Sequence, residues 1–302
     1  MSDDPYWSAE SPGGPSGRFG GGDALVTDTF ASWWNAALGV VARSWRTMGL
    51  ILLIGAVLPR WLLGAYWLLA SPDGDASEAA FTDGDWGAAV DESLPGLPAA
   101  IVGALLGLAL LYLGAVAAMA ATRTAAAEAA GGFLSLGEAF GFGFGRGWRL
   151  WLWLLPAWAT IAVGMLLCVL PGLWAAFALS LMVPAATFEH RRSPYARSVQ
   201  LTHSAFWAAL GRLIIVVMVV FAVNIVIGLL GAVLAGVWSA VFSGWLASVL
   251  TVATEAVMAL LLLVPMIWVL AAALCTYAWL RGRREPVSAT SLSAEAADRA
   301  DA

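Results

Sequence analysis

The stretch from Leu213 to Gly236, LIIVVMVVFAVNIVIGLLGAVLAG, decides the fold class of this 302-residue chain. It contains no charged side chain, and Asn224 is its one strongly polar residue. A helix needs roughly 20 apolar residues to cross a hydrocarbon core of about 30 Å, so this stretch can span a membrane. Comparable stretches elsewhere predict six spans in all, at about 47–69, 98–122, 150–170, 173–188, 213–236 and 256–279. Pro171-Gly172 separates the third span from the fourth and predicts a tight turn.

The composition excludes a water-soluble globular protein. Hydrophobic residues make up 61% of the chain, charged residues 12%, and the mean hydropathy is +0.83. That leaves too little polar surface to cover a soluble domain of this length. We therefore expect a membrane domain over residues 25–284, with disordered polar tails at 1–24 and 285–302. Residues 1–24 lack the basic start and short apolar core of a secretion signal, so the first span is expected to be retained.

The basic residues predict how the spans are oriented. There are 15 of them, all Arg, and every one except Arg60 falls in a segment that can lie on one side of the membrane. Multi-pass proteins retain Arg on the cytoplasmic side. Both termini are therefore predicted to be cytoplasmic, in a bacterial plasma membrane, with the acidic loop 71–97 outside. The predicted inner residues are Arg18, Arg43, Arg46, Arg123, Arg146, Arg149, Arg191, Arg192, Arg197, Arg212, Arg281, Arg283, Arg284 and Arg299.

An amphipathic segment precedes each predicted pair of spans. Residues 30–46 place aromatic and aliphatic side chains on one helical stripe, as in a helix lying in the membrane interface. A second segment opens with the capping box Ser135-Leu136-Gly137-Glu138, and a third with the N-cap and first-turn proline Ser193-Pro194. We predict an all-α, polytopic integral membrane protein, with six transmembrane helices in three hairpins, each preceded by a cytoplasmic amphipathic helix.

Glycine and alanine predict close helix packing in the second span. The stripe consists of Gly103, Gly107, Gly114, Ala118 and Ala121. Small residues let helix backbones approach in lipid, so we expect this stripe to contact a neighbouring helix. The alternating glycines of residues 141–147 fit no phosphate-binding loop, and they predict a loosened interfacial helix or loop.

The Arg residues of the amphipathic segments are candidates for binding anionic lipid headgroups. These candidates are Arg43, Arg46, Arg146, Arg149, Arg197 and Arg212. Each is worth about 1 kcal/mol near a charged membrane surface. The alternative is that they only set the topology.

Arg60 and Glu255 are the candidate intramembrane charges. Arg60 follows Pro59 within the first span, whereas Glu255 is placed at the start of the sixth. Ionisable residues inside a membrane are functional candidates, although Arg also extends to headgroups or forms a structural ion pair. Glu255 is the predicted partner for such a pair, and Asn224 is expected to form an interhelical hydrogen bond. A central polar cavity containing Arg60, Asn224 or Glu255 would favour a transporter.

The sequence offers no pattern for catalysis, a metal or a cofactor, and we expect none of the three. His190 and His203 do not have metal-ligand spacing. The predicted positions of Cys168 and Cys275 near opposite membrane faces exclude a disulfide between them. Aspartates in the 71–97 loop suit Ca²⁺, but they lack the spacing of an EF-hand loop, and a solvated outer loop is favoured.

The stretch from Val183, VPAATFEHRRSPYARSVQLTHSAFWAALG, resembles the membrane-domain family named after glycerophosphoryl diester phosphodiesterases. The matching positions are Pro184, Glu189, Arg197, Ser198, Leu201, Thr202, Phe206, Trp207 and Gly211. The resemblance extends loosely over residues 25–286. It implies a membrane part without catalysis, because the phosphodiesterase chemistry of that family belongs to a separate soluble barrel.

The function expected from the sequence is that of a non-enzymatic plasma-membrane protein. It would act as a scaffold or accessory subunit in envelope or lipid biology, with Arg and Trp on its cytoplasmic face. Its expected partners are membrane lipids and a membrane protein or a second copy, but no nucleic acid. The main alternative is a transporter or permease subunit, favoured by the repeated hairpins. A membrane-embedded enzyme is a third alternative.

Overall fold

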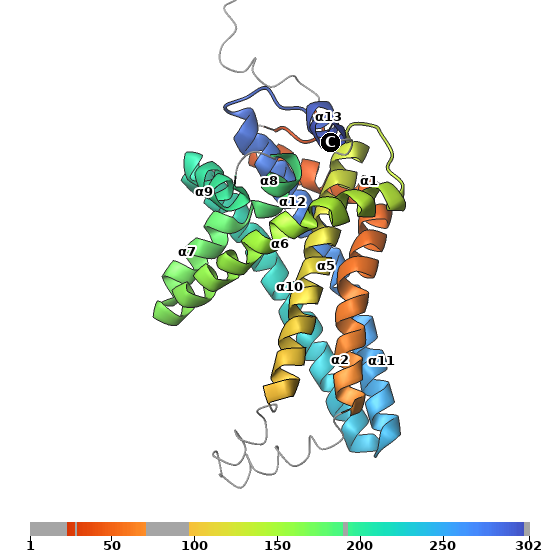
Figure 1. The fold of residues 1–302 in the computed structure, drawn as a ribbon. Helices are drawn as coiled ribbons and strands as arrows, with labels where there is room; N and C mark the ends of the chain where they lie inside the picture. The colour runs from red at the N-terminus through yellow and green to blue at the C-terminus, as the bar shows by residue number, and fades with distance from the viewer. Residues whose placement is uncertain (1–22, 28, 71–96, 190–192, 299–302) are drawn as a thin grey trace, which may run out of the picture.

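A computed structural model describes residues 23–27, 29–70, 97–189 and 193–298, and within these ranges the protein is all-α (Figure 1). Six segments are long and apolar enough to cross a membrane, which confirms the predicted fold class of a multi-pass membrane protein. The elements are α1 (Phe30–Leu52), the π-helix η2 (Leu53–Val57), α2 (Leu58–Ala70), α5 (Leu97–Ala129), α6 (Leu136–Leu167), α7 (Val169–Leu179), α8 (Met182–Phe188), α9 (Pro194–Ser204), α10 (Phe206–Val241), α11 (Trp245–Leu261), α12 (Leu263–Gly282) and α13 (Ala289–Ala297).

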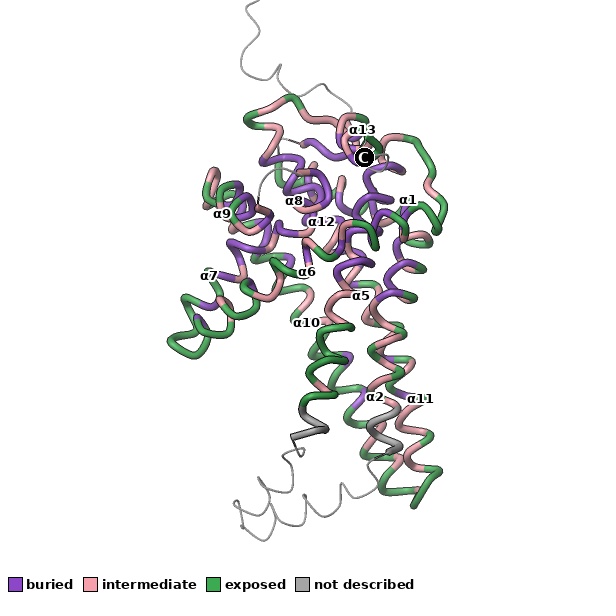
Figure 2. Tube along the Cα trace, viewed as in Figure 1, coloured by how far each residue is buried: buried purple, intermediate pink, exposed green. Residues whose placement is uncertain are grey.

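The packed core lies at one end of the molecule, where α1 begins and α5 and α12 end (Figure 2). Trp33, Phe188 and Tyr277 are among its fully buried side chains. The Trp33 indole donates to Thr276 Oγ1 at 3.1 Å and ties α1 to α12. At the same end Asp23 Oδ2 accepts from the Ala289 backbone N–H at 2.9 Å, so the first described residues meet the C-terminal helix. The described Arg residues gather at this end, apart from Arg60, and we call it the arginine-rich end.

Apolar side chains cover the outside of the other half of the molecule. On α10, Val226, Leu229 and Val233 are each more than 60% exposed, and Val257 on α11 is also exposed. Such a surface is stable in contact with lipid rather than water. The helices α2, α10 and α11 run side by side through this half, and the hairpin of α6 and α7 leans away from them (Figure 1).

Two of the three predicted amphipathic helices are not separate elements. The segments 30–46 and 136–149 continue into their spans without a break, as parts of α1 and α6. The Ser135–Glu138 capping box is present, with Ser135 N–H donating to Glu138 Oε2 at 2.8 Å. The third segment is separate, since α9 ends before Ala205, whose backbone (φ −145°, ψ 57°) leaves the helical region. Ser193 caps α9 as predicted.

All four alternating glycines lie within the helix α6, and two of them form a tight helix crossing. Gly143 and Gly147 lie in α6 against Val116 of α5. A Cβ added to Gly143 would stand 2.7 Å from the Val116 carbonyl oxygen, so only glycine fits there. The expectation of a loosened helix or loop at residues 141–147 is therefore wrong.

Two predicted boundaries also shift. The chain turns between α6 and α7 at Cys168 (φ −171°, ψ 147°), and Pro171-Gly172 lies inside the first turn of α7. After α10 the chain turns at 242–244, where Gly244 takes a positive φ of 65° that favours glycine. The sixth span therefore begins at Trp245 rather than near residue 256.

The predicted C-terminal tail contains a helix. Residues 289–297 form α13, which begins with a capping box at Ser288 and buries Leu292 against the core. The expectation of a disordered segment from 285 is wrong for these residues. Four predictions lie outside the described residues: the N-terminal tail up to residue 22, the acidic loop 71–96, His190, and the inner placement of Arg18, Arg191, Arg192 and Arg299.

Candidate functional site: a cavity among the spanning helices

A cavity of about 1100 Å³ lies among the spanning helices. Its wall comes from η2, α2, α5, α6, α8, α10, α11 and α12, and most of it is apolar. Four polar side chains reach this wall, from three different helices: Arg60, Asn224, Thr251 and Glu255. A central polar cavity containing Arg60, Asn224 or Glu255 is the feature expected to favour a transporter. The observed cavity is lined by all three residues, and the rest of its wall is mostly apolar.

Arg60 and Glu255 both lie far from the arginine-rich end. Arg60 is about 14 residues beyond Arg46 on one nearly continuous helix, or roughly 21 Å at about 1.5 Å per residue. Glu255 lies about 10 residues into α11, roughly 15 Å from its start. With the arginine-rich end and the start of α11 taken as the two surfaces of a hydrocarbon core about 30 Å thick, these distances place both charges within the core. The predicted place of Glu255, at the start of the sixth span, is thus too shallow.

No ion pair within 4.0 Å joins Arg60 to Glu255, nor either of them to another residue in the described ranges. Both residues are exposed, and both line the cavity. The structural pair that was one of the alternatives for Arg60 is not formed. Asn224 Nδ2 donates to Val220 O of its own helix at 2.8 Å, and among the described residues Asn224 has no hydrogen bond to another helix, contrary to the expectation.

Both charged helices are irregular where they meet the cavity. Pro59 has no N–H to donate to Gly55 O. In the π-helix η2 just before it, a backbone hydrogen bond spans five residues instead of four, from Leu58 N–H to Leu53 O. Likewise Pro265 lies just beyond the break between α11 and α12 at Leu262. Interrupted helices line the binding sites of many transporters, and π-turns are frequent at functional sites.

Small residues widen the cavity instead of packing two helices together. Gly107, Gly114 and Ala118 line it from α5. A Cβ added to Gly107 or Gly114 would meet nothing within 4 Å. The helix contact predicted for this stripe is therefore wrong at these two glycines, and their missing side chains leave space for a ligand.

The candidate headgroup residues divide into two groups. Arg43 and Arg46 are exposed, with the Arg46 guanidinium 5.2 Å from the centre of the Trp45 ring, and Arg146 and Arg149 are partly exposed. Arg197 and Arg212 are only 4% and 5% exposed. Those two were expected on the membrane surface, and their placement is corrected because both are enclosed by packed helices.

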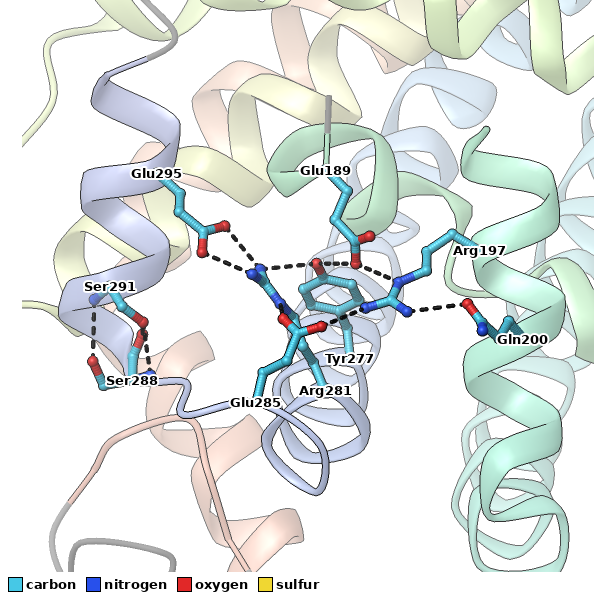
Figure 3. Close-up of polar contacts among 9 residues, drawn as sticks. All are labelled: Glu189, Arg197, Gln200, Tyr277, Arg281, Glu285, Ser288, Ser291 and Glu295. Carbon is cyan, nitrogen blue, oxygen red and sulfur yellow. Dashed lines mark hydrogen bonds and ion pairs between the residues drawn. The ribbon is translucent and has the colours of Figure 1, made fainter. Parts of the chain in front are cut away.

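Arg197 belongs to a network of charged groups that joins four helices at the arginine-rich end (Figure 3). Its Nε donates to Glu189 Oε1 at 2.7 Å, and the same oxygen accepts from the Tyr277 hydroxyl at 2.9 Å. Arg281 holds Glu295 of α13 through both terminal nitrogens at 2.8 Å. Glu285 connects the two arginines, at 3.5 Å from Arg197 and 2.9 Å from Arg281. This network fixes the ends of α8, α9, α12 and α13.

Other residues of the 183–211 stretch also hold α9 against the core. Ser198 Oγ donates to Ala178 O at 2.7 Å and accepts from Leu181 N–H at 3.1 Å, across the break between α7 and α8. Thr202 is buried one turn later on α9. In this chain, therefore, Glu189, Arg197 and Ser198 hold α9 against the core.

Among the described residues, no group of three or more His, Cys, Asp and Glu side chains is arranged to hold a metal ion. Cys168 and Cys275 are free thiols, one exposed and one buried. His203 packs edge-on against Trp174, with ring centres 5.4 Å apart.

No protein-family model, curated protein or solved structure matches this chain.

Proposed function

We propose that this multi-pass membrane protein binds an amphiphilic ligand in the cavity and acts as a transporter or permease subunit. The observation that most directly supports this proposal is that Arg60 and Glu255 border one intramembrane cavity without an ion pair between them. Charges at this depth are costly unless they have a partner, and they mark substrate or ion paths in transport proteins. The ligand supplies a partner that no residue in the described ranges provides.

The chemistry of the wall indicates the class of ligand. Most of the lining is aliphatic or aromatic, including Trp61 and Trp158, and suits a hydrocarbon portion. Arg60 suits an anionic oxygen, because a guanidinium presents several N–H donors in one plane. Glu255 suits a hydroxyl or ammonium group. The ligand is thus an amphiphile with an anionic group and a hydrogen-bond donor, of the size of a membrane lipid or a fragment of one.

The proposed function is not enzymatic. In this proposal the arginine-rich end faces the cytoplasm of a bacterial cell. With that orientation the cavity charges lie toward the outer leaflet. The similarity of residues 183–211 to the phosphodiesterase-named membrane domains supports a role in envelope or lipid biology.

A scaffold or accessory subunit is the second candidate function. It is favoured by exposed aromatic rings at the arginine-rich end, where Trp45, next to Arg46, is 53% exposed and Trp207 is 80% exposed. Exposed Trp and Arg are common in protein interfaces. The two functions are distinguished by whether the cavity holds a ligand.

Native mass spectrometry of the full chain, purified in a mild detergent, tests the transporter proposal. We expect the wild type to retain an amphiphile, and Arg60→Gln and Glu255→Gln to reduce its occupancy about tenfold. Arg284→Gln, at an exposed arginine of the other end, is the matched control and should leave occupancy unchanged. Equal occupancy in all four proteins, or none in any, would remove the basis of the proposal.

A further inference from the structure

Arg212 is a buried arginine without a counter-charge in the described part of the chain. It lies on α10 near the arginine-rich end and is 5% exposed. Its guanidinium donates no hydrogen bond to a described residue, and Nη1 is fully enclosed without a partner. The two other arginines of the nearby network differ from it, because Arg197 and Arg281 each hold a carboxylate within 3 Å.

Tryptophan rings hold the Arg212 guanidinium in place. Its central carbon lies 3.5 Å from the centre of the Trp279 ring and 5.7 Å from that of Trp33. Stacking on a ring covers a face of the guanidinium, while the N–H donors point outward along its edge. A buried N–H group that bonds to nothing is costly. Because Nη1 is itself enclosed, an acceptor from outside the chain would approach the guanidinium through the 5% of the residue that stays accessible.

A second positive charge lies beside the first. Arg283, just after α12, stands 5.5 Å from the Trp279 ring and is close enough to repel Arg212 electrostatically. No described carboxylate forms an ion pair with Arg212 or Arg283. The two arginines therefore place positive charge from α10 and the end of α12 around one indole ring, and nothing described neutralises it.

We propose that Arg212 and Arg283 form a binding site for a phosphate oxyanion. A guanidinium edge matches two oxygens of a phosphate, and such charge-assisted bonds are stronger than neutral ones. Arg212 lies roughly 9 Å along α10 from its start, at the arginine-rich end. The oxyanion is thus a phospholipid headgroup or a free phosphate compound. This site is separate from the cavity of Arg60 and Glu255, and either can exist without the other.

Thermal unfolding of the full chain in maltoside, a phosphate-free detergent, tests the site with two probes. The first probe is inorganic phosphate, with chloride at equal ionic strength as its reference. The second is phosphatidylglycerol in the micelle, with an uncharged glycolipid as its reference. We expect the wild type to gain stability from at least one probe. A response to phosphatidylglycerol alone assigns a lipid headgroup, and a response to inorganic phosphate assigns a soluble phosphate compound.

The variants separate this site from general charge attraction. Arg212→Gln is expected to lower the affinity for the stabilising probe about tenfold. Arg212→Lys should restore part of that affinity, because Lys keeps the charge without the planar edge. Arg284→Gln removes an exposed neighbouring charge that stacks on no described aromatic ring, and it should change the affinity less than about twofold. If Arg212→Gln does not fold, Arg283→Gln replaces it and should weaken binding severalfold. No response in the wild type, or an equal loss in the Arg284 variant, would overturn the site.

Discussion

The indole N–H of Trp61 donates to the backbone carbonyl of Val252 at 3.3 Å, and this bond joins the helix of Arg60 to the helix of Glu255. Both residues also line the cavity. We predict that Trp61→Phe, which keeps an aromatic ring but removes the N–H, lowers the free energy of unfolding by about 1 kcal/mol. Thermal unfolding in detergent measures this, with the exposed Trp245→Phe as the control. An equal Tm for both variants would show that the bond does not hold α2 to α11.

The glycine crossing of α5 and α6 gives a second prediction. Gly143→Ala should destabilise the protein by about 1–3 kcal/mol, because its new Cβ would overlap the Val116 carbonyl. Gly145→Ala lies two residues away, where an added Cβ meets nothing within 4 Å. It should be neutral or stabilising by up to about 1 kcal/mol, since alanine favours a helix. A loss of stability as large in Gly145→Ala would argue against this crossing.

The charged network should be most sensitive at Arg197. Arg197→Met leaves Glu189 partly buried without its strongest partner, which should cost about 3–5 kcal/mol. Adding Glu189→Gln to that variant should recover part of the loss, because the two residues are coupled. Unfolding midpoints of the single and double variants measure this coupling. Strictly additive losses would contradict it.

The proposed orientation can be checked with single cysteines. The background is the chain with Cys168→Ser and Cys275→Ala, and the probes are Ser243→Cys at the α10–α11 turn and Thr290→Cys on α13, both at exposed positions. A membrane-impermeant maleimide should label Ser243→Cys in intact spheroplasts and Thr290→Cys only after lysis. The reverse pattern would place the arginine-rich end outside.

The spans and helix starts were predictable from the sequence because they depend on local chemistry. A run of apolar residues is enough to indicate a spanning helix. The caps at Ser135 and Ser193 involve residues only three positions apart, so their side chains find the same backbone partners in any context. Helix α13 was missed because its stability comes from packing against α5 and from the distant Arg281, which local sequence does not indicate.

The candidate site was predictable by residue but not by geometry. Arg60, Asn224 and Glu255 were identifiable as polar groups in apolar surroundings, yet their meeting in one cavity depends on the arrangement of three helices. The depth of Glu255 is underestimated because the sixth span is predicted to begin at about residue 256, whereas α11 begins at Trp245 and its hydroxyls bond within the helix, as Thr251 Oγ1 does to Ala247 O. Gly244 was the available signal for the turn. A small-residue stripe identifies a helix face, but not whether a helix or a cavity lies opposite it.

A cryo-electron microscopy map of the wild-type protein in lipid nanodiscs would test the central claim most directly. The measured feature is the density between Arg60 and Glu255. Bound amphiphile should appear as elongated density in the cavity, with its polar end against Arg60, and it should be missing from an Arg60→Gln map prepared in the same way. A closed cavity in which Arg60 and Glu255 form a direct ion pair, with no ligand density in the wild type, would contradict the claim.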